Sequence, residues 1–176
     1  SEQKIRAQLE EKERKRLETE TKNLREYRSV FFGRLKKILG DIEGIDVVGD
    51  RFVFSSEVLF DRGSADIGLA GKIQLDTISS VLKDISKKIP EDINWVLRVD
   101  GHTDKTPLSQ NSIFRDNWEL SQARSLSVVK YMINIHEINP KRLSAAGFGE
   151  HQPISFSNSN EALARNRRIE FKLTER

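Results

Sequence analysis

The sequence of 176 residues contains no cysteine. Disulfide bonds, thiolate metal sites and a cysteine nucleophile are therefore excluded. No run of apolar residues approaches the roughly 20 that a helix needs to cross a bilayer, and no apolar core of a signal peptide is present. Because the chain begins at Ser1 rather than Met, we expect a fragment or a processed form whose export signal or membrane anchor lies upstream.

An excess of charge of one sign is also lacking. The chain carries 30 Lys and Arg against 27 Asp and Glu, for a formal net charge of +3. So small an excess does not favour a nucleic-acid partner. Arg165, Arg167 and Arg168 form a basic cluster, but it lacks the interleaved aromatic residues that single-strand binding uses. We therefore expect no nucleic-acid partner.

Residues 1–28 contain neither glycine nor proline, and 7 acidic and 9 basic residues make up most of the segment. Opposite charges four residues apart support a helix by a few tenths of a kcal/mol each. The segment is therefore predicted to be a charged helix. The predicted pairs are Glu2–Arg6, Glu10–Arg14, Glu11–Lys15 and Glu18–Lys22.

A seven-residue repeat runs along the same region, as in one seam of a coiled coil. The companion seam is mostly polar, with only Leu35 apolar. The pattern fits either a dimerising stalk or a single solvated helix. We expect residues 1–44 to form this stalk and a linker, with the amphipathic segment 29–40 ending at Gly40. The repeat consists of Leu17, Leu24, Phe31 and Ile38.

Residues 45–176 are predicted to form the globular domain. Alternating apolar residues indicate strands, and apolar residues spaced by three and four indicate helices. The interleaved order favours an α/β (α+β) two-layer sandwich with a mixed β-sheet and helices on one face, preceded by a long N-terminal helix. The predicted elements are a hairpin at 45–54, a helix at 67–89, a strand at 93–100, a helix at 117–136, a strand at 143–148, a helical turn at 161–165 and a strand at 169–173.

Two polar residues could bind a ligand. Asp104 follows a buried strand, where a carboxylate can accept hydrogen bonds from an ammonium group, or simply satisfy the loop amides in an Asx-turn. Arg124 flanks the buried stripe of helix 117–136 and could bind a carboxylate through two nitrogens, or form a salt bridge between helices. Taken singly, both residues favour the structural interpretation.

Five segments in order resemble the OmpA-like C-terminal domain, a family that includes the peptidoglycan-binding Pal and MotB proteins. The resemblance covers roughly residues 45–175 and is nearest to MotB-like proteins in the phrase LFDRGSA. The segments are VLFDRGSADI (58–67), VDGHTDKTPLS (99–109), NWELSQARSLSVVKYM (117–132), RLSAAGFGEHQPI (142–154) and ARNRRIEFKL (164–173).

The resemblance implies a non-catalytic domain that binds peptidoglycan stem peptides without a cofactor or metal. Asp104, preceded by Thr103, is similar to the residue that binds the ammonium group of diaminopimelate. Arg124 is similar to the residue that binds the carboxylate of the same ligand. Further matched positions are Asn117, Leu120 and Ser121 in the pocket wall, Phe60 and Asp61 in the first loop, and Asn166 and Arg167 in the N-R-R segment.

The resemblance also implies a cellular setting. We expect a periplasmic domain of a bacterial protein that is anchored in a membrane, the inner rather than the outer one, and that forms a homodimer. Segment 105–116 is longer than in Pal-type domains, so it could reshape the pocket or reach a partner.

Two other functions fit parts of the sequence. One is a stator-like or coupling subunit of a MotB-type complex, in which the domain mainly mediates dimerisation and partner binding. The other is an enzyme or metal site, but there is no H-x-x-x-H, G-x-S-x-G or P-loop motif. Its candidate residues are His102, His136, His151, Asp100, Asp104 and Glu150.

Overall fold

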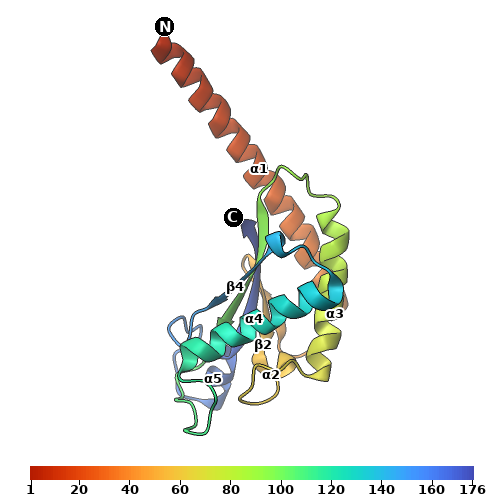
Figure 1. Cartoon of the computed structure of the whole chain (residues 1–176), viewed down its shortest axis with the longest axis vertical. Coiled ribbons are helices and arrows are strands. Elements are labelled where there is room, and N and C mark those ends of the chain that lie inside the picture. The colour runs from red at the N-terminus through yellow and green to blue at the C-terminus, as the bar shows by residue number, and fades with distance from the viewer.

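The computed structural model describes residues 1–176 and confirms the predicted fold class: one five-stranded mixed sheet with helices packed on one face (Figure 1). The helices are α1 (Glu2–Leu39), α2 (Ser56–Leu59), α3 (Leu69–Ser86), α4 (Asn117–His136), η1 (Pro140–Arg142) and α5 (Asn160–Asn166). The strands are β1 (Ile45–Val48), β2 (Arg51–Ser55), β3 (Trp95–His102), β4 (Leu143–Gly147) and β5 (Arg168–Glu175).

The last strand lies in the middle of the sheet, whose order is β1-β2-β5-β3-β4. Strands β3 and β4 are parallel and the other pairs are antiparallel. In this register Arg168 pairs with both Ser55 of β2 and His102 of β3. The end of β2, the end of β3 and the start of β5 therefore meet at one edge, which places Glu57, Asp104 and Arg167 close together.

Alternation along β5 divides the two faces of the sheet. Ile169, Phe171 and Leu173 are fully buried in the core beneath the helices, whereas Glu170 and Lys172 point to the opposite face, as period-two geometry requires. Phe54 packs edge-on against Phe171, with ring centroids 5.4 Å apart. The core is thus built around the central strands.

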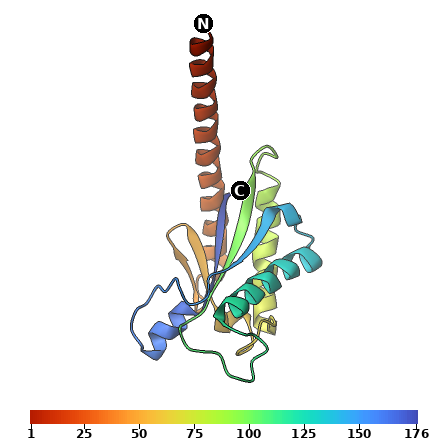
Figure 2. The same cartoon turned by 60° about the vertical axis from the view of Figure 1, so that its left-hand side comes forward.

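Helix α1 has two different halves (Figures 1 and 2). Its N-terminal half projects away from the sheet and is exposed. In the C-terminal half, Phe31, Leu35 and Leu39 are buried in the same core as the sheet. Of the four residues of the predicted heptad seam, Leu24 and Phe31 are buried in this core, whereas Leu17 and Ile38 are exposed.

Several predicted boundaries are confirmed and others shift. Helix α4 spans the predicted residues 117–136, and the predicted hairpin turns at Gly49, which has a positive φ of 61°. Helix α3 is shorter than the predicted 67–89, and the short helix α2 was not predicted. None of the helices combines the length and apolar character needed to span a bilayer.

Candidate ligand-binding site

A cleft of about 840 Å³ opens at the edge where β2, β3 and β5 meet. Its walls come from α2 and the loop that follows it, the loop after β3, the first turns of α4, and α5. Seven of the ten predicted site residues line it: Phe60, Thr103, Asp104, Asn117, Leu120, Arg124 and Arg167.

Asp104 lines this cleft and is buried, with 7% of its surface exposed. Its Oδ1 accepts a hydrogen bond from the backbone N–H of Thr106 at 2.8 Å, which is the Asx-turn considered from the sequence. Its Oδ2 accepts a hydrogen bond from Nη1 of Arg167 at 2.6 Å. Because each carboxylate oxygen has two lone pairs, Asp104 retains capacity for a further donor.

The loop around Asp104 is fixed by side chains. Asn117 Nδ2 donates to the carbonyl oxygens of Asp104 and Thr106 at 3.3 and 3.2 Å. The hydroxyl of Thr103 donates to the carbonyl of Asp104 at 2.8 Å, and the N–H of Thr103 donates to the carbonyl of Gly149. These bonds hold the carboxylate in position before a ligand arrives.

Arg124 is buried but forms no ion pair. Its Nε donates to the carbonyl of Ser64 at 2.8 Å, and its guanidinium lies 5.1 Å from the centroid of the Phe60 ring. Burial lowers the pKa of Arg124, the charge of Glu57 opposes this shift, and the charge of Arg167 adds to it. The salt bridge between helices considered from the sequence is absent, and the two terminal nitrogens bond to nothing within the chain.

Residues 59–167 match the OmpA family. The chain belongs to the OmpA family. The matched range begins one residue before Phe60 and ends at Arg167, so it includes all of the predicted site residues.

Proteins similar to this chain include MotB and MotB-like proteins. YtxE of Bacillus subtilis is 34% identical over 125 residues, which are 71% of this chain and 48% of that protein. The chain thus spans about half the length of this relative. The structure of a MotB-like protein from Desulfovibrio vulgaris is 29% identical with a TM-score of 0.75, covering 90% of this chain and 95% of that one. The periplasmic domain of Helicobacter pylori MotB is 26% identical with a TM-score of 0.64, covering 78% and 83%.

Three predicted site residues of the OmpA-family domain do not line the cleft. Ser121 accepts a hydrogen bond from the N–H of Gly149 and donates to the carbonyl of Trp118. The side-chain oxygen of Asn166 accepts from two backbone N–H groups of the preceding loop, and its Nδ2 donates to the carbonyl of Ser155. Asp61 is exposed beside the cleft. Ser121 and Asn166 therefore support the loops that shape the site.

Glu57 lines the cleft and was not predicted. Its Oε1 accepts a hydrogen bond from Nε of Arg167 and lies 2.8 Å from Nη2 of the same residue, and its Oε2 accepts one from the hydroxyl of Ser55 at 2.5 Å. Burial acts to raise the pKa of Glu57, but the hydrogen bonds from Ser55 and Arg167 outweigh it and lower that pKa. No sequence motif marks this residue, because its partner lies 110 positions away.

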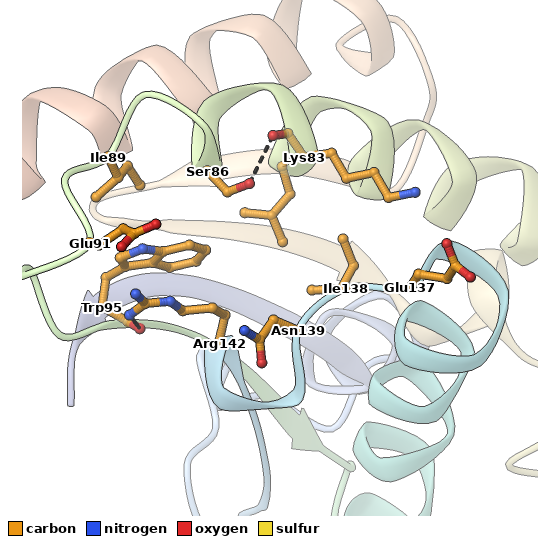
Figure 3. Close-up of a pocket in the computed structure, with 10 residues that line it drawn as sticks. Lys83, Ser86, Ile89, Glu91, Trp95, Glu137, Ile138, Asn139 and Arg142 are labelled. Atoms are coloured by element: carbon orange, nitrogen blue, oxygen red, sulfur yellow. Dashed lines mark hydrogen bonds between the residues drawn. The ribbon is translucent and has the colours of Figure 1, made fainter.

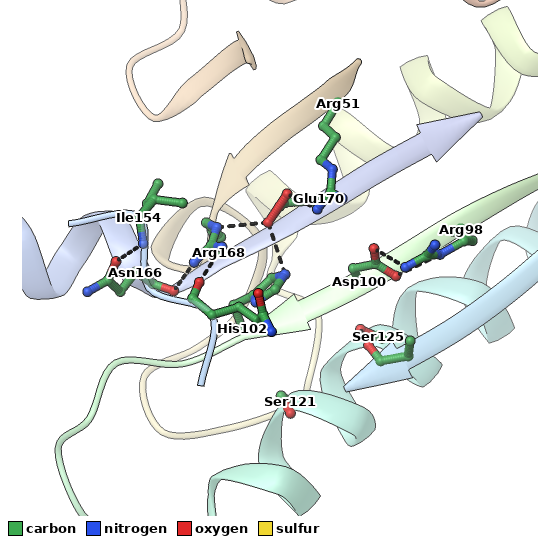
Figure 4. A network of polar contacts seen from close by, with 12 residues as sticks. Arg51, Arg98, Asp100, His102, Ser121, Ser125, Ile154, Asn166, Arg168 and Glu170 are labelled. Atoms are coloured by element: carbon green, nitrogen blue, oxygen red, sulfur yellow. Dashed lines mark hydrogen bonds and ion pairs between the residues drawn. The ribbon is translucent and has the colours of Figure 1, made fainter. Parts of the chain in front are cut away.

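A buried polar network lies on the opposite face of the sheet (Figure 4). Glu170 forms ion pairs with Arg51 at 2.8 Å and Arg168 at 2.9 Å, and its Oε2 lies 2.9 Å from Nε2 of His102. The contact between Glu170 and His102 does not have the geometry of a hydrogen bond. The imidazole ring of His102 stacks on the ring of Phe148, with centroids 5.0 Å apart. Burial acts to raise the pKa of Glu170, but the contacts with His102, Arg51 and Arg168 outweigh it and lower that pKa to about 2.

The histidines considered for an enzyme or metal site lie in three separate places. His102 belongs to the network just described, His136 pairs with Asp76 at 2.6 Å, and His151 stacks on Trp118. No group of three or more His, Asp or Glu side chains is arranged to hold a metal ion. The geometry does not bring these residues together as one site.

A second cavity, of about 300 Å³, lies at the opposite end of β3 (Figure 3). Arg142 lies over the ring of Trp95 at 4.8 Å. Its Nη1 donates to the carbonyls of Ile93 and Trp95. Arg142 therefore donates two hydrogen bonds to backbone carbonyls of the chain, whereas Arg124 donates one.

Proposed function

We propose that this domain binds peptidoglycan stem peptides without catalysis, through the end of diaminopimelate that carries an ammonium and a carboxylate on one carbon. The observation that carries the proposal is Arg124, a buried guanidinium with two free nitrogens and no carboxylate partner. A buried charge without a partner is costly, and a ligand carboxylate bound through two nitrogens would remove that cost.

Asp104 supplies the complementary charge. It lines the same cleft as Arg124, and its loop is held by Asn117 and Thr103. An ammonium group donates up to three hydrogen bonds, and the Asp104 carboxylate has lone pairs to accept one or two of them. An acid and an arginine that both keep bonding capacity in a single cleft, Asp104 and Arg124, suit a zwitterionic group better than a simple cation or anion.

The same proposal assigns the chain to the periplasm, as the wall-binding part of a protein anchored in a membrane by a segment upstream. The exposed half of α1, with Ile5, Leu9 and Leu17 exposed, would carry the domain away from the membrane. Pairing of two such helices would bury these side chains and form a homodimer. Two linked sites raise apparent affinity by about a hundredfold or more when both can engage.

Sedimentation with purified peptidoglycan sacculi tests the function. We expect the wild type to co-sediment, and Asp104→Ala and Arg124→Ala to stay in the supernatant while circular dichroism shows them folded. Asp66→Ala, which removes an exposed acid outside the cleft lining, is the matched control and should co-sediment. A wild type that stays in the supernatant, or folded variants that still pellet, would reject the proposal.

A further inference from the structure

Arg167 contacts both acids of the cleft at once. Its Nη1 donates to Asp104 at 2.6 Å, while its Nε donates to Glu57 Oε1 at 2.8 Å and its Nη2 lies 2.8 Å from the same oxygen. Burial opposes the shift, but the hydrogen bonds to Asp104 and Glu57 raise the pKa of Arg167. The guanidinium therefore stays charged, with two of its three nitrogens on Glu57 and one on Asp104.

This arrangement bears on ligand binding because Asp104 is the proposed acceptor for the ligand ammonium. An arginine released from Glu57 could turn both terminal nitrogens onto Asp104 in the bidentate geometry that carboxylates favour. That pairing would take one of the two lone pairs that Asp104 still has free for the ammonium, and would place a second guanidinium nitrogen where the ammonium binds. The internal cation and the ligand cation thus compete for one carboxylate.

The backbone fixes Glu57 where it can hold Arg167. The N–H of Ser56 donates to the carbonyl of Arg167 at 2.9 Å, and Ser55 pairs with Arg168 across β2 and β5. Both oxygens of Glu57 are already engaged within the chain, by Arg167 and Ser55. Because both of its oxygens are bonded within the chain, Glu57 is placed to fix the guanidinium of Arg167.

We infer that Glu57 is a positioning residue: by holding Arg167, it keeps Asp104 able to accept the ligand ammonium. This inference rests on the proposed function and adds a residue that acts without touching the ligand. Glu57 sets the competition between the internal guanidinium and the ligand.

A double-mutant cycle tests the inference, with calorimetric titration of a soluble stem tripeptide that ends in diaminopimelate. Glu57→Gln should weaken binding about fivefold, the scale of one partly exposed ion pair. In an Arg167→Gln background the same change should have less than about a twofold effect, because the competing cation is gone. Glu43→Gln, on an exposed turn, is the control and should bind as the wild type does.

The outcomes separate the alternatives. Equal weakening by Glu57→Gln in both backgrounds would mean that Glu57 acts on the ligand directly, and would overturn the inference. A Glu57→Gln variant that binds the peptide with the affinity of the wild type would also overturn the inference. If Arg167→Gln itself abolishes binding, the crystal structure of Glu57→Gln decides: both terminal nitrogens of Arg167 on Asp104 support the inference, and an unmoved Arg167 overturns it. A wild type that does not bind the peptide rejects the proposed function and the inference together, whereas a binding wild type with a silent Glu57→Gln rejects the inference alone.

Discussion

Arg124 lies over the ring of Phe60, 5.1 Å from its centroid, and has no carboxylate partner in the folded chain. Attraction between a cation and an aromatic face contributes about 0.5–2 kcal/mol, depending on exposure. That and one hydrogen bond to Ser64 do not replace the hydration a guanidinium loses on burial. The two terminal nitrogens of Arg124 are not among the fully buried atoms, so they face the open cleft, and we expect the partly buried charge to cost stability in the absence of a ligand.

Replacing Arg124 with Met should separate binding from stability. Met retains much of the apolar stem and removes the unpaired charge, so the free energy of unfolding should stay within about 1 kcal/mol of the wild type or increase. Binding to sacculi should be lost. Urea unfolding and co-sedimentation measure the two effects on one preparation, and a loss of several kcal/mol would show that Arg124 is chiefly structural.

Arg142→Met is the matched control for this prediction, since Arg142 also lies over an aromatic ring but donates to two backbone carbonyls. Its removal leaves the carbonyls of Ile93 and Trp95 without that donor. We expect a loss of about 1–3 kcal/mol in stability with unchanged binding. Arg124→Met should therefore lose binding and keep stability, whereas Arg142→Met should lose stability and keep binding.

Glu170 should make the domain sensitive to acid. Its pKa in the folded chain is about 2, below the ordinary value of 4.5, so the unfolded chain binds the proton more tightly. The stability that Glu170 contributes is therefore present above its unfolded pKa and lost as pH falls from about 5 to about 2. Glu170→Gln should cost about 3 kcal/mol at pH 7, because Arg168 remains buried without its partner.

Urea unfolding of wild type and Glu170→Gln between pH 7 and pH 2.5 checks this expectation. The difference in unfolding free energy should shrink steadily through that acid range. A difference that stays constant from pH 7 to pH 2.5 would show that the Glu170 charge is not what stabilises the network. Glu43→Gln, on an exposed turn, should follow the wild type throughout.

The fold could be predicted largely from local patterns. The buried stripe of α4, with Leu120 and Val129, repeats with helical spacing and set both ends of that helix correctly. Alternation around Ile169 and Phe171 likewise identified the closing strand. Such patterns can be recognised because the position of a residue within one helix or strand fixes the side of that element on which its side chain lies.

The residues of the candidate site could be predicted from the sequence only in part. Asp104 and Arg124 stand in recognisable segments, but the Glu57–Arg167 pair depends on the register of β2 with β5, which no local pattern specifies. The burial of Phe31 in the domain core is a similar case. A heptad seam looks the same whether it packs on a second helix or on a sheet of its own chain.

Close packing of α4 on the sheet gives a further prediction. A Cβ at Gly101 would lie 2.3 Å from the carbonyl oxygen of Ser121 and 2.6 Å from the hydroxyl of Ser125, so Gly101→Ala must push α4 outward. We expect a loss of about 1–3 kcal/mol in stability and weaker binding, because α4 carries Asn117 and Arg124. Thermal unfolding and co-sedimentation measure both.

The control for this prediction lies in α1. A Cβ at Gly33 would meet nothing within 4 Å, and the residue is exposed within a helix. Gly33→Ala should therefore stabilise the domain by about 0.5–1 kcal/mol. Destabilisation by both changes alike would point to a general intolerance of larger side chains and against a specific clash at Gly101.

Truncation tests where the stalk ends and the domain begins. Residues 1–20 are almost entirely exposed and lie outside the core, so a chain of residues 21–176 should stay folded and still pellet with sacculi, with a lower apparent affinity because the proposed pairing of helices is lost. A chain of residues 45–176 lacks Phe31, Leu35 and Leu39, all buried in the core. Burying such side chains contributes about 2 kcal/mol each, against a total stability of about 5–15 kcal/mol for a typical domain. The shorter chain should therefore be unfolded or strongly destabilised, as circular dichroism would show. Cooperative unfolding of both chains at the same temperature would instead mean that α1 is a stalk along its whole length and that the domain begins at Ile45.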